Sequence, residues 1–153
     1  MIRFVIFCFC VVTLLWSVAA EVVNFGGCDY TDNLCDVNEV RIDPCKEASR
    51  NQACRIKRGK LASIDVYFTP KIAAQTLHSQ PYWYNGINHI PLEGMDTDGC
   101  KTTTCPLQSG VKQQYRYELQ LKPDYPLATY TVRWNLTSGT DGCCFSVRLK
   151  LTR

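Results

Sequence analysis

The sequence predicts an all-β protein, a sandwich of two antiparallel sheets made of seven or eight short strands. Three observations support this fold class. Apolar and polar residues alternate along several segments, glycine-containing turn signals separate those segments, and no segment shows a sustained helical period. The 133 residues that follow the first 20 of the 153 suit one sandwich domain and are too few for two full domains.

The first 20 residues have the features of a secretory signal peptide. Arg3 precedes an apolar run over residues 4–16, and small residues that include Val18 and Ala20 follow the run. The run is shorter than the roughly 20 apolar residues that a bilayer-spanning helix needs. We therefore expect cleavage before Glu21, a single domain at residues 21–153, and a secreted protein, with the lysosome as a second destination.

Four segments of this domain are predicted to be strands because every second residue is apolar, which buries one face of each strand. In chain order, the inward positions are Ile64, Val66 and Phe68, then Tyr115, Tyr117, Leu119 and Leu121, then Tyr130, Val132, Trp134 and Leu136, and finally Phe145, Val147, Leu149 and Leu151. Weaker strands are expected over residues 22–25, 37–42, 76–79 and 87–92, between turns such as Lys57-Arg58-Gly59, Asn85-Gly86 and Ser138-Gly139.

Eight cysteines remain after the signal peptide, and an even number in an exported chain indicates a disulfide framework. Counting alone leaves 105 pairings open. In the segment DGCKTTTCPL, four residues separate Cys100 from Cys105. A zinc site favours shorter spacings and needs further ligands, and a redox pair usually has Cys-x-x-Cys at a helix start. A disulfide that closes the long loop of residues 93–110 is therefore favoured.

The composition argues against several classes of function. After removal of Arg3, 16 basic and 14 acidic side chains give a net charge of +2, too even a balance to suggest a nucleic-acid partner. His78 and His89, the two histidines, both lie in expected strands, and the chain has no Gly-x-Ser-x-Gly motif. We therefore expect no enzyme activity, no metal and no cofactor, and we expect a monomer.

Three motifs are expected at the surface. The basic run RIKRGK, residues 55–60, favours a solvated hairpin turn over a contact with anionic lipid or glycan. In PYWYNG, three consecutive aromatic residues cannot all face one core if the chain is extended. Tyr82, Trp83 and Tyr84 therefore either contact a membrane or a portal, or cap the end of the sandwich. Asn135 begins an Asn-Leu-Thr glycosylation acceptor and is expected to point outward.

Five segments occur in the order found in the Niemann-Pick type C2 proteins of the MD-2-related lipid-recognition (ML) family: VVNFGGCDY, DPCKEASRNQACRIKRGK, TDGCKTTTCPLQSG, LKPDYPLATYTVRWNL and CCFSVRLKL. The chain resembles an insect-type member over residues 22–151. The resemblance implies an immunoglobulin-like β-sandwich with a hydrophobic pocket between the sheets. It also implies three disulfides, Cys28–Cys144, Cys45–Cys54 and Cys100–Cys105. We expect the two remaining cysteines, Cys35 and Cys143, to form a fourth.

The same resemblance implies which residues surround a ligand. Tyr125 matches the tyrosine at the family's pocket entrance, Leu121 stands where the pocket usually has valine, and Leu92 stands where the sterol carriers have phenylalanine. The alternation of the strands adds a further set of inward residues, several of which we expect to line the pocket: Ile64, Val66, Phe68, Trp134 and Val147.

The resemblance and the residues together lead to three hypotheses. The first is a carrier that binds a sterol between the sheets and hands it to a membrane or a receptor. The second keeps the pocket but assigns it to microbial lipids in innate immunity, or to extracellular carriage of fatty acids or semiochemicals, because Leu92 in place of a ring favours linear ligands. The third is a structural sandwich with a fully packed interior.

Overall fold

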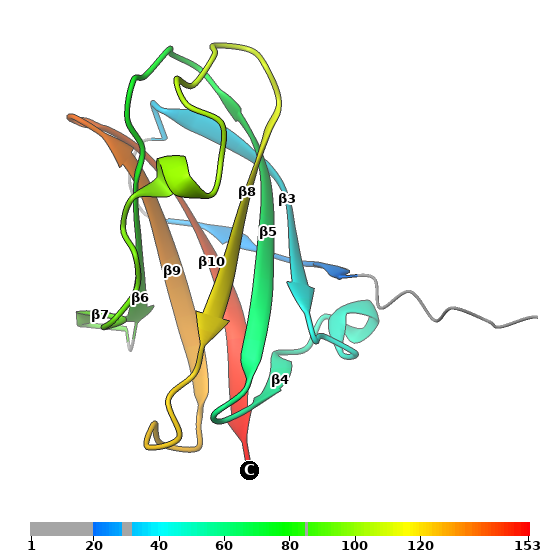
Figure 1. The fold of residues 1–153 in the computed structure, drawn as a ribbon. Helices are drawn as coiled ribbons and strands as arrows, with labels where there is room; N and C mark the ends of the chain where they lie inside the picture. Colours follow the sequence, from blue (N-terminus) through cyan, green and yellow to red (C-terminus); the bar gives the residue numbers. More distant parts are fainter. Residues whose placement is uncertain (1–19, 29–31, 85) are drawn as a thin grey trace, which may run out of the picture.

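The computed structural model describes residues 20–28, 32–84 and 86–153, and its fold is the predicted all-β sandwich (Figure 1). Ten strands form two sheets, and the helices in these ranges are two short 3-10 turns, η1 (Ala48–Arg50) and η2 (Gly99–Lys101). The expected signal peptide lies almost entirely outside the described residues and stays a prediction. In the described part of the chain, no helix has the length and apolar character to span a membrane.

The first sheet contains four antiparallel strands in the order β1-β3-β5-β8. Their bounds are β1 (Glu21–Val23), β3 (Cys35–Asp43), β5 (Leu61–Pro70) and β8 (Gln113–Gln120). The pairing of β3 with β5 shifts register between Val37 and Glu39, which marks a β-bulge. In this strand order, β8 forms one edge of the sheet and β1 the other.

The second sheet contains six strands, five of them in the order β2-β10-β9-β6-β7. Their bounds are β2 (Gly26–Gly27), β6 (His78–Tyr84), β7 (His89–Pro91), β9 (Thr129–Ser138) and β10 (Asp141–Thr152). The sixth strand, β4 (Cys54–Lys57), pairs with the last residues of β10 and is parallel to it. In Figure 1, β6 and β7 lie on the side opposite β3 and β4.

The hydrophobic core lies between the two sheets and is built from the alternating residues of the four clearest predicted strands. Val66 and Phe68 of β5, Trp134 of β9 and Phe145 of β10 all have 0% of their surface exposed. Their neighbours in sequence point to the outer faces, as the period of two requires. The prediction of these strands from alternation is confirmed.

Two weaker strand predictions and one turn prediction need correction. Of the strand expected over residues 22–25, only Val22 and Val23 belong to a strand, β1, and the next strand, β2, begins at Gly26 and belongs to the other sheet. The strand expected at residues 76–79 begins at His78 and continues through the aromatic run to Tyr84. The basic run expected as a turn begins as a strand, since Arg55 to Lys57 belong to β4 and the turn occupies residues 58–60.

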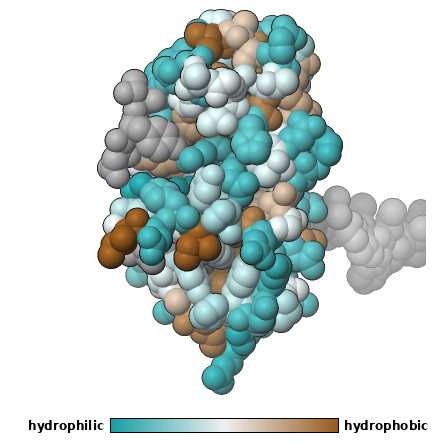
Figure 2. Space-filling model, turned by 90° about the vertical axis from the view of Figure 1, so that its left-hand side faces the viewer, coloured by the Kyte–Doolittle hydropathy of each residue, from teal (hydrophilic) through white to brown (hydrophobic). Residues whose placement is uncertain are grey.

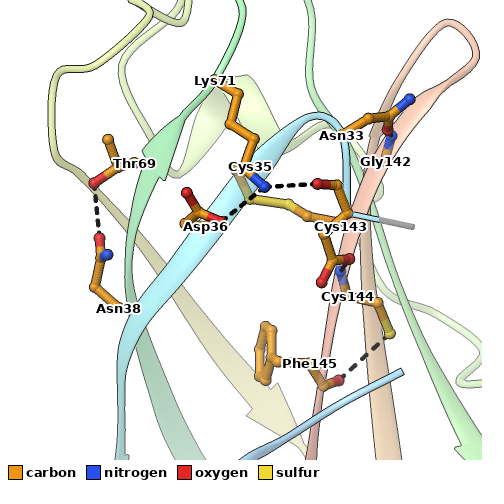
Figure 3. The surroundings of a disulfide bond; sticks show 11 residues. Asn33, Cys35, Asp36, Asn38, Thr69, Lys71, Gly142, Cys143, Cys144 and Phe145 are labelled. Carbon is orange, nitrogen blue, oxygen red and sulfur yellow. Dashed lines mark hydrogen bonds and ion pairs between the residues drawn. A yellow bond between two sulfur atoms is a disulfide. The ribbon is translucent and has the colours of Figure 1, made fainter. Parts of the chain in front are cut away.

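Four disulfides join the eight cysteines after the signal peptide. Cys28 pairs with Cys144, Cys45 with Cys54 and Cys100 with Cys105, the pairs that the resemblance implied. Cys35 of β3 pairs with Cys143 of β10 and thus joins the two sheets, as Figure 3 shows. The Cys100–Cys105 bond closes the loop that contains η2. The segment DGCKTTTCPL therefore contains the disulfide that was favoured over a zinc site and a redox pair.

Candidate functional site

The residues predicted to line a pocket meet between the two sheets. Strand β5 supplies three of them, β9 and β10 supply one each, and Leu92 and Leu121 follow directly after β7 and β8. All seven are 3% exposed or less: Ile64, Val66, Phe68, Leu92, Leu121, Trp134 and Val147. Their side chains belong to one continuous cluster of buried hydrophobic residues. We refer to this cluster as the inter-sheet core.

Aromatic rings fill the centre of the inter-sheet core. The ring of Trp134 stacks on that of Phe145 with centroids 6.1 Å apart. It meets the rings of Tyr115 and Tyr117 edge-on, at 6.1 Å and 5.6 Å. A space of about 20 Å³ beside Val147, about the size of one water molecule, lies at the margin. The predicted lining residues thus form a buried apolar interior in this structure.

A buried polar triad links the two sheets inside this core. The indole N–H of Trp134 donates to Ser79 Oγ at 2.7 Å, and Ser79 Oγ shares a second hydrogen bond of 2.7 Å with the hydroxyl of Tyr115. Ser79 lies on β6, Trp134 on β9 and Tyr115 on β8, so the triad bridges the sheets. Burial raises the pKa of Tyr115 to about 12, which keeps its hydroxyl neutral at physiological pH.

Three aromatic side chains, Trp83, Tyr125 and Tyr130, cover the core at the end where β6 and β8 finish. We call them the aromatic portal. The ring of Trp83 lies 5.7 Å from Tyr125, nearly perpendicular to it, and 4.3 Å from Tyr130. All three are half-buried and pack against the inter-sheet core. The structure therefore brings together Tyr125 and Trp83, which were singled out for separate reasons in the sequence.

The loop that carries Tyr125 is anchored by the turn between β4 and β5. Arg58 donates a hydrogen bond to the carbonyl oxygen of Tyr125 at 3.0 Å, and the N–H of Gly59 donates to that of Leu121 at 2.7 Å. Gly59 has φ of +72°, a conformation that residues with a side chain rarely adopt. The hydroxyl of Tyr130 donates to Pro126 at 2.8 Å. The position of the portal loop thus depends on residues far away in the sequence.

The two tyrosines of the aromatic run, on either side of Trp83, point away from the core. The rings of Tyr82 and Tyr84 lie 6.1 Å and 4.8 Å from that of His89 on β7. The guanidinium of Arg133 lies 3.7 Å from the centroid of the Tyr84 ring, a cation–π contact. Of the three consecutive aromatic residues, Trp83 alone faces inward, which resolves the conflict that the sequence posed. Membrane contact by this run stays a prediction.

The face formed by β6 and β7 also carries isolated apolar residues. Ile87 and Ile90 are 86% and 53% exposed. Figure 2 shows compact hydrophobic spots on this face within a mainly hydrophilic surface. Asn135, the predicted glycosylation site, lies on β9 opposite Gln80 of β6 and is partly exposed, and its glycosylation stays a prediction.

Sequence reasoning missed three residues of this site. Tyr115 was predicted to face inward but was given no role, Tyr130 was treated as a core residue, and Ser79 was not recognised at all. A signal for a residue such as Ser79 was present, because a buried tryptophan usually finds a partner for its N–H. Among the described residues, no cluster of three His, Cys, Asp or Glu side chains has the arrangement of a metal site.

Comparison with known proteins identifies the family. The family model of the ML domain matches residues 22–151. This chain belongs to the ML-domain family. An MD-2-related lipid-recognition protein of Manduca sexta is 32% identical over 142 residues, which cover 90% of each chain. The NPC intracellular cholesterol transporter 2 of Bos taurus is 29% identical over 136 residues, which cover 88% of this chain and 87% of the bovine protein.

A solved structure has the same fold as this chain. The Niemann-Pick type C2 protein of the Japanese carpenter ant superimposes with a TM-score of 0.75, over 84% of this chain and 99% of the ant protein. Its sequence identity is 17%, so the likeness is one of fold. It supports the prediction of an immunoglobulin-like sandwich that the resemblance implied.

Proposed function

We propose that this ML domain is a secreted lipid carrier that takes an apolar ligand between its sheets, and that a sterol is the principal ligand. The observation that carries the proposal is the aromatic portal above an inter-sheet core of buried hydrophobic side chains. Apolar surface binds apolar ligands without directional contacts, at about 25 cal/mol per Å² removed from water. The bovine relative is named a cholesterol transporter, which favours the same ligand class.

A second ligand class, linear acyl lipids, is favoured by Leu92. This residue is 3% exposed in the inter-sheet core and stands where the sterol carriers were expected to have a phenylalanine ring. A branched aliphatic side chain gives less flat surface for stacking on a rigid ring system. The Manduca relative is named a lipid-recognition protein, which is compatible with such a ligand. Recognition of microbial lipids belongs to this second class.

The two ligand classes are separated by competition between a fluorescent sterol and a fluorescent fatty acid on delipidated protein. Saturable one-to-one binding of the sterol, with little displacement by the fatty acid, supports sterol carriage. The reverse order supports acyl-lipid carriage or recognition. If protein with all four disulfides binds neither ligand saturably, the carrier proposal fails.

The role of the portal is tested by Trp83→Ala, with the adjacent Tyr84→Ala as a matched control. Aromatic pairs contribute about 0.5–1.5 kcal/mol beyond their burial, and Trp83 contacts two rings in addition to any ligand. We expect Trp83→Ala to weaken lipid affinity about tenfold, equivalent to about 1.4 kcal/mol. Tyr84 points to the outer face, so its substitution should change the affinity less than about twofold. Equal effects would show that the portal has no special role.

A further inference from the structure

A groove of about 600 Å³ lies at the end of the sandwich where β4 and β10 finish. Five of its lining side chains are basic and one is acidic. The lining residues are Pro44, Lys46, Glu47, Arg55, Ile56, Lys57, Lys60, Leu61, Thr152 and Arg153. We refer to it as the basic groove. The RIKRGK motif supplies four of its ten lining residues, so the strand β4 and the turn after it place this motif along the groove.

The strand pairing concentrates positive charge along the basic groove. Alternation in β4 buries Cys54 and Ile56 and turns Arg55 and Lys57 to the outer face, where both are exposed. The parallel register places Lys150 of β10 next to Arg55. Neighbouring strands lie about 4.8 Å apart, and like charges at such positions repel one another. An anion at this surface would relieve that repulsion.

Among the described residues, the cations of the groove have no partner in an ion pair. Within the part of the chain that the structure describes, none of Lys46, Arg55, Lys57 and Lys60 takes part in an ion pair. Residues 21–153 carry a net charge of only +2, because 14 acidic side chains offset 16 basic ones. The charge at this end is therefore a local concentration and not a reflection of an overall basic protein.

The groove also exposes apolar surface, and it is connected to the aromatic portal. Leu61 is 58% exposed at its margin. The turn between β4 and β5 links the two features, because Arg58 is hydrogen-bonded to Tyr125 and Gly59 to Leu121. A surface that binds at the groove would lie near the portal.

We propose that the basic groove docks the protein on the anionic surface of a phospholipid bilayer. This proposal rests on the proposed carrier function, for which it names the surface that approaches the donor or acceptor membrane. Clustered lysines and arginines bind anionic headgroups, and the exposed Leu61 suits the boundary between headgroups and acyl chains. A sulfated glycan would use the same cations but would leave the apolar margin unexplained, so the bilayer is favoured.

The test measures binding of the secreted protein to phosphatidylcholine vesicles with and without phosphatidylserine, by flotation. The test variant is Lys57→Gln/Lys60→Gln. Its matched control is Lys101→Gln/Lys112→Gln, which removes the same charge from exposed lysines beyond the start of β8, at the opposite end of the sheet. Each lysine near an anionic surface contributes about 1 kcal/mol, a factor of about five, so the test variant should bind about 30-fold more weakly.

Several outcomes decide the proposal. Binding that requires phosphatidylserine, falls between about 0.1 and 0.5 M salt, and is lost in the test variant but kept in the control supports it. Equal binding to both vesicle types, equal losses in the two variants, or retention on heparin without vesicle binding overturns it. Lipid binding is measured separately without vesicles. Its failure beside intact vesicle docking would contradict the carrier function and still support the docking surface.

Discussion

The two disulfides that end on adjacent cysteines should stabilise the fold in a strongly non-additive way. Cys28–Cys144 spans a sequence separation of 116, and Cys35–Cys143, drawn in Figure 3, spans 108 within it. While one bond is intact, the other closes only the small ring made by residues 28–35 and 143–144, ten residues in all. Once one bond is lost, the remaining bond closes a ring of more than 100 residues.

The chain-entropy relation turns this topology into free energies of unfolding. A ring of about ten residues corresponds to about 2.7 kcal/mol and a ring of over 100 residues to about 4.8 kcal/mol. Removing either bond alone should therefore cost about 2.7 kcal/mol, and removing both about 7.5 kcal/mol. The sum of the single effects is about 5.4 kcal/mol, so the two bonds should be coupled by about 2 kcal/mol.

The assay is denaturant unfolding under non-reducing conditions of Cys35→Ala/Cys143→Ala, Cys28→Ala/Cys144→Ala and the fourfold variant. The loss of sulfur packing contributes to both variants that lack one disulfide and to the fourfold variant. The coupling free energy between the two bonds therefore isolates the effect of ring size. The distant Cys45–Cys54 bond, with a separation of 9, provides a control pair whose removal should add to either single effect within about 0.5 kcal/mol. Additive behaviour of Cys28–Cys144 and Cys35–Cys143 would refute the reasoning.

Two further predictions concern the buried triad. Ser79→Ala leaves the Trp134 N–H unpaired and removes a hydrogen bond to Tyr115, so it should lower the free energy of unfolding in denaturant by about 2–4 kcal/mol. The control Ser63→Ala, on the outer side of β5, should change stability by less than about 0.5 kcal/mol. A Ser79→Ala effect as small as that of the control would contradict the role of the triad. Burial raises the pKa of Tyr115 from 10.0 to about 12, so its contribution to stability is complete below pH 10 and declines as the pH rises toward 12. Between pH 8 and pH 11 the protein should lose about 1 kcal/mol more stability than Tyr115→Phe. Parallel losses in the two proteins would exclude this cause.

The sequence predicted the strands whose neighbours impose a clear choice between core and solvent. Val66 and Trp134 alternate with polar residues, and a shift by one position would turn every apolar side chain outward. Such strands can be predicted from the local sequence alone. By contrast, β4 is four residues long and pairs with the end of β10 almost 100 residues away, with Cys54 opposite Leu149. No local sequence pattern indicates the pairing of β4 with β10, so the basic run was interpreted as a turn.

The aromatic run was left outside the predicted strands, which included residues 76–79 but not the residues after them. Pro81 lacks an N–H, and such a residue argues against the interior of a sheet. In the structure β7 covers β6 only from Tyr82 to Tyr84, and Pro81 lies just outside that pairing, where its carbonyl accepts from the N–H of Leu92 at 3.0 Å. The proline therefore occupies an edge position within an otherwise continuous strand.

The arrangement of covalent links gives a physical reason for the place of the portal. Cys35–Cys143 and Cys45–Cys54 both join the β3 side of one sheet to the β10 and β4 side of the other. In the described chain no disulfide links β6 or β7 to β8, and hydrogen bonds join this edge, among them the bond between Ser79 and Tyr115 and the bond from the N–H of Asp96 to the hydroxyl of Tyr117. A lipid that enters between the sheets, as proposed, must displace closely packed side chains. The separation is least constrained between β6 and β8, and the aromatic portal lies at the end of that edge.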